Sequence, residues 1–495
     1  MHEIELKFQV PTGRRAALER AVAGRAPQRR IRLQAAYCET VQRALAKARL
    51  ALRVRREGRQ WVQTLKGATE DGMTRLEHNV PRGSGAAVPL VDPALHAGTP
   101  VGDRLQAALG ATADARLGVL YRTDILRRTR VLRNALGGVE LALDAGSIQA
   151  GDAKLAVHEL EFELLRGSPL AVILAARRWL LRFGLWLDTR SKAERGDMLA
   201  RGESIAPPRE ARRVQLQPAM SPAQALRVVL GSCADQIVAN ASQIASGEHA
   251  DEHVHQLRVG LRRLRSALRF FAGTPVDAAL EPAAAALFRR LGTARDQVVI
   301  EAGFTADLQA ALDAAGVSGS VPRAAAAGDE AAPAIVLRDP DSQALLLDLL
   351  TATHAQDVPA PVAESPLRDQ LAARLNRWHR RAAEGAKHYR ALDDAGRHRL
   401  RKQVKRLRYA LEFSAALFRP GDVRRYLARL RAAQERLGAI NDVVIAMQAF
   451  SRVRDTDPRA WFALGWLASR RDVLIAQALP DLKAFANAKR FWKGG

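Results

Sequence analysis

The sequence predicts an α+β protein, in which an N-terminal half made of antiparallel strands is followed by an all-helical half. Residues 2–8 alternate strictly between an apolar face and a charged face, and the charged face is formed by Glu3, Glu5 and Lys7. Beyond residue 222 the alternation stops, and long segments rich in Ala, Leu and Arg favour helices. A repeated basic segment within this second half predicts two related helical units.

Length and composition indicate where the two halves meet. A chain of 495 residues exceeds what one ordinary core holds, so we expect at least two domains. Residues 203–222 combine prolines with basic residues, which is typical of an interdomain linker. We therefore predict a strand-rich domain at 1–202, a linker at 203–222 and a helical domain at 223–490.

The formal net charge of +25 indicates a polyanionic partner, such as nucleic acid, an anionic membrane surface or polyphosphate. Aromatic residues make up only 5% of the chain, so the stacking surfaces that single-stranded nucleic acids need are scarce. We therefore rank nucleic acid well below a phosphate-rich ligand.

Three features predict a soluble cytoplasmic protein without a membrane partner. Cys38 and Cys233 are far apart and have no metal-ligand spacing, which is typical of a reducing compartment. The chain opens in a charged strand, unlike a signal peptide. Its most apolar stretch, residues 170–187, is interrupted by arginines and indicates an amphipathic helix, because a membrane span needs a longer uncharged run.

Several later segments of the N-terminal half also alternate, and each places its charges on one face. A lone strand of this kind is usually half-buried with its charged face in water. Many such strands in one closed sheet would instead line an interior with charge. The charges available for that interior are Glu3, Glu5, Glu159, Glu161 and Glu163, and the cations Lys7, Arg53, Arg55, Lys66, Arg75 and Lys192.

A charged interior of this composition predicts a particular chemistry. Two carboxylates ~4 Å apart repel by about 4 kcal/mol at an effective dielectric constant near 20, so the acidic wall needs cations. Fixed lysines and arginines supply some, and Mg²⁺ or Mn²⁺ prefers the remaining carboxylate oxygens. Metal-assisted phosphoryl hydrolysis needs this division, in which basic side chains hold the phosphates and a metal neutralises charge.

The motif Glu3-x-Glu5-x-Lys7 resembles the signature of the CYTH, or triphosphate tunnel metalloenzyme, family. Further matches follow in the family's order over some 200 residues, which makes the resemblance specific. They are Tyr37–Thr40, Leu52–Arg55, Thr64–Lys66, Arg75–Glu77, Leu143–Gly146, Glu159–Glu163 and Ser191–Gly196.

The resemblance implies a closed antiparallel β-barrel whose bore binds a triphosphate together with Mg²⁺ or Mn²⁺. Members of the family include inorganic, thiamine and RNA triphosphatases and a class of adenylyl cyclases. The implied metal ligands are Glu3, Glu5, Glu161 and Glu163. The implied phosphate-binding residues are Lys7, Arg53, Arg55, Lys66, Arg75, Arg127, Lys192 and Arg195, and the implied catalytic set is Glu3, Glu5, Lys7, Lys66, Glu161 and Glu163.

Two positions depart from the family pattern or leave it open. Glu39 stands where the family more often has Asp. In the segment from residue 121 to 132 the register is open, so any of Arg122, Arg127, Arg128 and Arg130 could face inward; we place Arg127 in the predicted set.

The helical half contains an internal repeat, His255–Arg265 and His398–Arg408. Both copies place apolar residues at the same helical spacing, and both place a basic stripe headed by histidine on another face. A single basic stripe is usually a solvated face, but two copies in one register favour an anion that bridges them. The two stripes are His255, Arg258, Arg262 and Arg265, and His398, Arg401, Lys405 and Arg408.

Both copies resemble the His-x-x-Arg-x-x-x-Arg/Lys-Arg-x-Arg pattern of the CHAD domain, a helical domain found attached to CYTH domains. The match covers about 220–490 and implies two helical bundles related by a pseudo-twofold axis that bind inorganic polyphosphate. The implied polyphosphate-binding residues are His255, Arg258, Arg262, Arg263, Arg265, His398, Arg401, Lys405, Arg406 and Arg408.

Together these observations predict an enzyme that hydrolyses inorganic triphosphate to pyrophosphate and phosphate, with a helical domain that binds polyphosphate. Association with polyphosphate granules is a further expectation. Two alternatives stay open: another enzyme of the tunnel family, such as an adenylyl cyclase or an organic triphosphatase, and a non-catalytic polyphosphate-binding or scaffolding protein. The sequence leaves open the preferred metal and chain length, the oligomeric state and any coupling between the domains.

Overall fold

The computed structural model describes residues 2–24, 29–68, 74–111, 116–323, 331–354 and 365–493, with backbone alone at 2, 3, 74, 75, 293–302 and 493. The chain forms two compact units. Unit 1 comprises residues 1–210, 234–257 and 337–355, and unit 2 comprises 211–233, 258–336 and 356–495. The domain limits at 202 and 223 stay a prediction.

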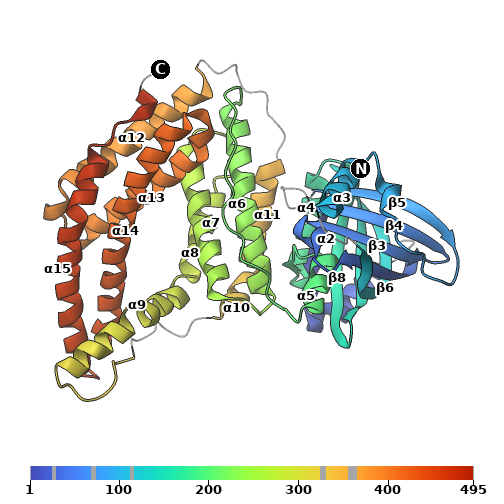
Figure 1. Ribbon diagram of the computed structural model, residues 1–495, viewed down its shortest axis with the longest axis horizontal. Coiled ribbons are helices and arrows are strands. Elements are labelled where there is room, and N and C mark those ends of the chain that lie inside the picture. The colour runs from blue at the N-terminus through green and yellow to red at the C-terminus, as the bar shows by residue number, and fades with distance from the viewer. Residues whose placement is uncertain are drawn as a thin grey trace. The chain divides into compact units, whose positions relative to one another are not determined.

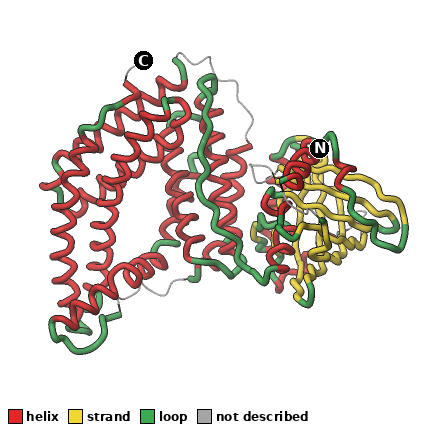
Figure 2. Tube along the Cα trace, viewed as in Figure 1, coloured by secondary structure: helices red, strands yellow, loops and turns green. Residues whose placement is uncertain are grey.

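Unit 1 contains a nine-stranded antiparallel sheet (Figure 1; yellow in Figure 2). Its order is β5-β4-β3-β2-β6-β7-β8-β1-β9, and β1 also pairs with β5 at residues 2–4. The first strand is therefore hydrogen-bonded to β8 along one stretch and to β5, at the other end of the order, along another. The strands are β1 His2–Gln9, β2 Arg29–Thr40, β3 Leu50–Glu57, β4 Gln60–Ala68, β5 Thr74–Ser84, β6 Leu117–Asn134, β7 Gly137–Ala150, β8 Ala153–Gly167 and β9 Trp186–Leu187.

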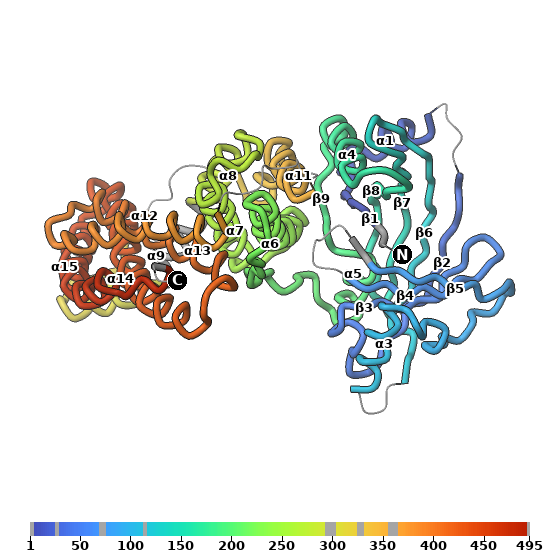
Figure 3. The backbone as a smooth tube through the Cα atoms, turned by 90° about the horizontal axis from the view of Figure 1, so that it is seen from above, coloured from blue at the N-terminus to red at the C-terminus, as the bar shows by residue number. Residues whose placement is uncertain are grey.

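The apolar faces of the strands pack against helices, which leaves the charged faces on the other side of the sheet. Phe8 and Phe162 are fully buried and meet edge to face with ring centroids 5.7 Å apart. Helix α4 packs against β1, β7 and β8, as Figure 3 shows. The helices of this part are η1 Thr12–Arg14, α1 Arg15–Ala23, α2 Ala44–Lys47, η2 Pro93–His96, α3 Pro100–Gly110, α4 Leu170–Phe183 and α5 Lys192–Ala200.

Helix α5 begins with a capping box that fixes the start of a functional segment. The Ser191 hydroxyl accepts from the Glu194 N–H at 3.0 Å, and the Glu194 carboxylate accepts from the Ser191 N–H at 2.7 Å. Lys192 is therefore held at the first position of the helix. Helix α4 ends at Phe183 and is followed by Gly184, whose positive φ of 63° is typical of the residue that caps a helix C-terminus.

The C-terminal half is helical, as predicted. Helices α12, α13, α14 and α15 of unit 2 pack together (Figures 1 and 3). Helix α12 contacts α13 and α15, and α14 contacts the same two helices. The helices of this half are α6 Pro222–Ala245, α7 Asp251–Phe270, α8 Leu280–Arg290, α9 Thr293–Ala314, α10 Pro333–Arg338, α11 Pro340–His354, α12 Leu367–Lys387, η3 Tyr389–Ala391, α13 Asp394–Ser414, η4 Ala415–Leu417, α14 Pro420–Ser451, α15 Arg459–Ala486 and η5 Phe491–Lys493.

The two copies of the repeat fall on α7 and α13. The apolar stripe predicted for α7 is buried at Leu257, Leu261 and Leu264, while Leu268 is only partly buried. All four members of the α13 stripe are buried, from Leu400 through Val404 and Leu407 to Leu411. The pseudo-twofold relation of two bundles stays a prediction. Among the described residues, no helix combines the length and apolar character of a membrane span.

Candidate phosphate-binding site

A cavity of about 960 Å³ lies on the charged face of the sheet in unit 1. Its lining mixes acidic and basic side chains from eight strands, β1 to β8, with the segment that enters α5. The predicted site residues in this lining are Glu5, Lys7, Arg53, Arg55, Lys66, Arg127, Glu161, Glu163 and Lys192.

Strand register explains why residues far apart in sequence meet in this cavity. Lys7 of β1 stands opposite Glu161 of β8, and Asp144 of β7 stands opposite Glu159 of β8. Arg127 of β6 is opposite Asp144 in turn. Directly paired residues lie on one face of an antiparallel sheet, so a row of charges crosses four neighbouring strands.

The centre of this row is a buried ionic cluster. Arg127 donates to Asp144 through Nε at 2.7 Å and Nη2 at 2.6 Å, and also contacts Glu161. Lys192 Nζ lies 2.6 Å from Asp144, 2.8 Å from Glu161 and in contact with Glu159. A buried charge is tolerated only when it is paired, and here three carboxylates share these two cations with a third, Arg195, on Glu159.

The cluster shifts the pKa values of its members in opposite directions. Burial alone would raise the pKa of Glu161, but Lys192, Arg127 and Lys7 hold it well below its usual range. Burial alone would lower the pKa of Lys192, but the three carboxylates raise it above its ordinary value. Glu161 and Lys192 are therefore both charged at neutral pH.

Three carboxylates in this cluster provide the type of ligand that a divalent metal ion needs. Single oxygens of Asp144, Glu159 and Glu161 lie within 4.8 Å of one another. Hard carboxylate oxygens are the donors that Mg²⁺ and Mn²⁺ prefer, so the donor set fits such an ion. Lys192 Nζ contacts the same three carboxylates, so the lysine and a metal compete for them.

This cluster differs from the predicted metal set, which was Glu3, Glu5, Glu161 and Glu163. Only Glu161 belongs to both. The side chain of Glu3 lies outside the described residues, and Glu5 and Glu163 face each other farther along β1 and β8. Burial raises the pKa of Glu163; Lys66 counteracts this, while Glu5 and Glu140 add to it. Asp144 and Glu159 were present in the recognised motifs, and only the pairing of β7 with β8 brings them together.

Further basic side chains of the cavity lie on β3 and β4. Lys66 Nζ lies 2.9 Å from Glu77, and Arg55 donates through Nε to Glu57 at 2.7 Å. Burial lowers the pKa of Arg55, and the neighbouring cations Arg53 and Arg127 add to this effect. Like charges gathered in a buried place are stabilised by a bound anion, which is what phosphate would supply.

Two stacked tyrosines hold one of these arginines. Arg53 Nη1 donates to the Tyr37 hydroxyl at 2.9 Å, and Tyr37 stacks on Tyr121 with ring centroids 4.6 Å apart. Gly196 of α5 lies against this pair, because a Cβ built on it would stand 2.2 Å from the Tyr121 ring. The glycine of the Ser191–Gly196 motif is therefore required for α5 to approach the sheet.

The structure separates the four arginines whose direction the sequence left open. Arg127 points into the cavity, whereas Arg128 lies 3.4 Å from Glu19 and Arg130 donates to the Ala21 carbonyl at 3.0 Å, both on α1. Arg122 is exposed. This alternation is what period-two geometry demands once one register is fixed.

Of three other residues of the predicted motifs, two have structural roles and one has a side chain outside the described residues. Arg195 is buried against Glu159 and is absent from the cavity lining. Arg75 pairs with Glu3 through the backbone, and its side chain lies outside the described residues. The Glu39 carboxylate accepts from the Leu45 N–H at 3.0 Å and the Ala46 N–H at 2.8 Å, which caps α2.

In unit 2, basic residues of α7 and α13 face one another. Burial, Arg401 and Arg262 lower the pKa of Lys405 to about 6, although Asp442 opposes them. Burial, Arg406 and Arg265 likewise lower the pKa of Lys402. Cations from both copies of the repeat are therefore close enough to repel each other, and we call Arg262, Arg265, Arg269, Arg401, Lys402, Lys405 and Arg406 the basic seam.

Several members of the predicted polyphosphate set are held by protein groups. Arg258 is buried over the Phe288 ring and donates to the Leu291 carbonyl, and Arg263 is buried over Phe413. His398 Nδ1 lies 2.9 Å from Asn441 Oδ1. Arg408 pairs with Glu412 at 2.9 Å, and His255 is partly buried in unit 1.

Comparison with known proteins identifies two domain families along the chain. Residues 1–196 match the CYTH domain model and residues 228–451 match the CHAD domain model. The solved CHAD domain of Ricinus communis is 29% identical, with a TM-score of 0.44, over 58% of this chain and 98% of that one. A Hippeastrum protein, named for adenylyl cyclase activity and found to have a dominant triphosphatase activity, is 19% identical, with a TM-score of 0.30, over 41% of this chain and 97% of that one. The chain is therefore a protein with a CYTH domain followed by a CHAD domain.

Proposed function

We propose that this protein hydrolyses inorganic triphosphate to pyrophosphate and phosphate in the cavity of unit 1, with Mg²⁺ or Mn²⁺ as cofactor. The observation that carries the proposal is the make-up of the cavity: Asp144 and Glu161 of the buried carboxylate cluster line it together with Lys7, Arg53, Arg55 and Lys66. Membership of the CYTH family supports a triphosphate as the substrate class.

The pairing of β1 with both β8 and β5 supports a sheet that closes around the substrate. In such a tunnel the phosphate chain would contact basic side chains on every side, and water would be restricted. Electrostatic stabilisation is strongest in a place of this kind, because the donors are fixed before the reaction begins.

Charge balance explains how substrate and metal would enter together. In the free protein the three carboxylates are matched by Arg127, Lys192 and Arg195. A triphosphate attracts the nearby cations of Arg127 and Lys192 to its own oxygens. Asp144, Glu159 and Glu161 would then be available to hold a divalent ion, which would supply charge neutralisation and acidify a nearby water.

The chain's own residues would orient the phosphates and move one proton. Arg53, Arg55 and Lys66 hold phosphate oxygens, and Lys7 and Arg127 hold the end nearest the carboxylates. We assign proton acceptance to a carboxylate oxygen of Glu163, because burial and the charges of Glu5 and Glu140 raise its pKa above that of an ordinary glutamate.

For the CHAD domain we propose binding of inorganic polyphosphate along the basic seam. The observation that supports it is the gathering of cations from both repeat copies, beside which Glu281 pairs with Arg265 at 2.9 Å and Arg269 at 2.8 Å. A linear polyanion would relieve this repulsion, and its affinity should fall steeply with salt. Association with polyphosphate granules would follow from it.

One observation favours a second candidate, a polyphosphate-binding protein without turnover: Lys192 already contacts all three carboxylates of the cluster. Phosphate release from inorganic triphosphate, ATP and thiamine triphosphate at equal concentrations separates the possibilities. Preference for inorganic triphosphate supports the proposal. Preference for an organic triphosphate, or cyclic AMP formed from ATP, would assign another enzyme of the tunnel family, and binding without release would leave the second candidate.

A further inference from the structure

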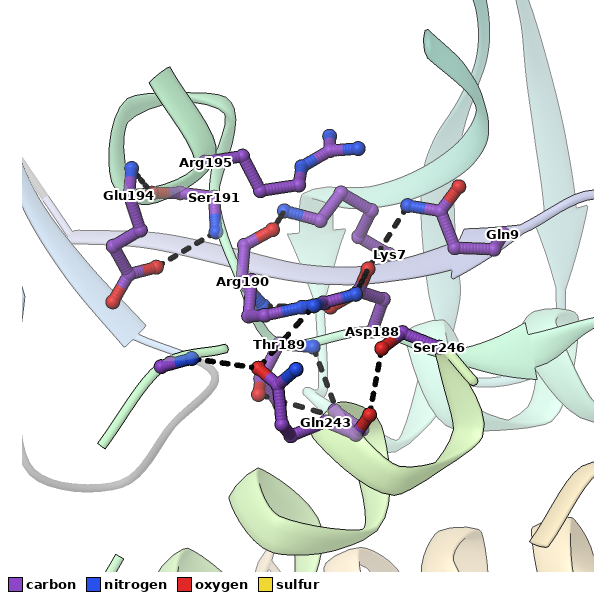
Figure 4. Close-up of polar contacts among 12 residues, drawn as sticks. Lys7, Gln9, Asp188, Thr189, Arg190, Ser191, Glu194, Arg195, Gln243 and Ser246 are labelled. Atoms are coloured by element: carbon purple, nitrogen blue, oxygen red, sulfur yellow. Dashed lines mark hydrogen bonds and ion pairs between the residues drawn. The ribbon is translucent and has the colours of Figure 1, made fainter. Parts of the chain in front are cut away.

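Lys7 of the cavity is held by the segment Leu187–Ser191, which joins β9 to α5 (Figure 4). The Asp188 N–H donates to the Lys7 carbonyl at 2.9 Å. The Lys7 ammonium in turn donates to the Arg190 carbonyl. Both ends of the Lys7 residue therefore depend on where this segment lies.

The segment is stiffened from within by Asp188, which is fully buried. Its carboxylate accepts from Arg190 Nε and Nη2, each at 3.0 Å, and from Gln9 Nε2 at 3.0 Å. Gln9 is two residues beyond Lys7 on β1, so β1 and the segment are joined on both sides of the lysine. Burial alone would raise the pKa of Asp188, but Arg190 and its neighbours hold it at about 2.

The same segment is also contacted by residues of α6, which belong to the range that matches the CHAD domain and lie in unit 1. Ser242 Oγ of α6 accepts from the Thr189 N–H at 3.2 Å and donates to the Val238 carbonyl at 2.8 Å, with the Leu187 carbonyl 3.2 Å away. Gln243 Oε1 accepts from Arg190 Nη1 at 3.3 Å.

The side chains that make these contacts are buried, so losing a hydrogen-bond partner would cost stability. Ser242 is 0% exposed and Gln243 2% exposed. Gln343 of α11, 1% exposed, adds a third anchor, since its Oε1 accepts from the Leu187 N–H at 2.8 Å. A buried polar group that loses its partner is costly, so each side chain fixes the backbone atom that it contacts.

We propose that Ser242 and Gln243 are positioning residues for Lys7, so that the α6 part of the CHAD domain completes the phosphate site of the CYTH domain. The consequence for catalysis rests on the proposed function, in which Lys7 binds phosphate. The positioning itself does not depend on it. The CYTH domain match ends at residue 196, and the side chains that orient its lysine come from beyond that limit.

Ser242→Ala in the full chain tests the proposal, with Ser414→Ala as its matched control. Ser414 is also fully buried and also donates to a carbonyl four residues earlier in its helix, that of Ala410 at 2.8 Å, but it lies in unit 2. Amide hydrogen exchange of Asp188 is the first readout, because its N–H donates to Lys7 and does not touch Ser242. We expect exchange about three- to tenfold faster in Ser242→Ala and unchanged in the control, as expected for the loss of one hydrogen bond.

Kinetics provide the second readout. The KM for triphosphate should rise by about three- to tenfold in Ser242→Ala with kcat nearly unchanged, since a lost binding contact acts on KM. This effect should disappear when Lys7→Met is already present. Unchanged Asp188 exchange, equal change in the control, or a KM effect that persists with Lys7→Met would overturn the proposal. A wild-type protein without turnover would refute the proposed function instead, and the exchange measurement would still decide the positioning of Lys7.

Discussion

Lys405 should give polyphosphate binding a marked pH dependence. Burial, Arg401 and Arg262 lower the pKa of its ammonium to about 6, with Arg408 adding to the effect and Asp442 opposing it. At pH 7.5 most of the free protein therefore carries a neutral Lys405. A bound polyanion stabilises the charged form, so binding at this pH takes up a proton.

The sign and size of the effect follow from this shift. Below pH 6, Lys405 is charged with or without polyphosphate, so it adds no pH dependence. Above pH 6, the affinity falls as pH rises, by at most about tenfold per unit, because one pKa unit corresponds to about 1.4 kcal/mol. Between pH 6 and pH 8 the loss from this one group is at most about 100-fold.

Isothermal titration of long-chain polyphosphate from pH 6 to pH 8, at constant ionic strength and in two buffers of different ionisation enthalpy, measures both affinity and proton uptake. Lys405→Arg keeps the charge but does not titrate in this range, so it should flatten the dependence. Lys387→Arg, on an exposed position of α12, is the control and should behave like wild type. Equal pH slopes in Lys405→Arg and wild type would refute the reasoning, because the titration of polyphosphate itself is common to both.

Two further substitutions test the site and the packing behind it. Glu161→Gln should lower metal-dependent triphosphate turnover at least a hundredfold, because it removes a carboxylate from the cluster, while polyphosphate binding stays intact; Glu210→Gln, on an exposed position, should leave both unchanged. Loss of both activities in Glu161→Gln would show that the two are not divided as proposed. Gly196→Ala should destabilise the protein by about 1–3 kcal/mol in urea unfolding, because its Cβ would overlap the Tyr121 ring. Gly465→Ala, where a Cβ meets nothing within 4 Å, should be neutral or stabilising, and equal destabilisation of the two variants would contradict the packing argument.

Much of the fold could be predicted from local patterns in the sequence. Strict alternation in β1 assigned Glu5 and Lys7 to one face, and both line the cavity. The apolar stripe of the second repeat copy is buried from Leu400 to Leu411. Such periodicities are visible in sequence because a strand or helix repeats its own geometry over a few residues.

The sequence could not predict contacts that depend on which strands and helices become neighbours in the fold. Asp144 and Glu159 join Glu161 only through the pairing of β7 with β8, so the predicted metal set and the observed cluster share one residue. Arg258 belongs to the predicted basic stripe, yet the Phe288 ring and the Leu291 carbonyl bury it. The contact of Ser242 with Thr189 spans more than fifty residues and leaves no local pattern.

Phosphate release from inorganic triphosphate by the full chain tests most directly whether unit 1 is the metal-dependent triphosphatase that we propose. With Mg²⁺ or Mn²⁺ present, we predict turnover that yields one phosphate and one pyrophosphate per triphosphate, and that stops when the metal is chelated. Triphosphate that is bound but stays intact with either metal would contradict the claim and leave a phosphate-binding protein.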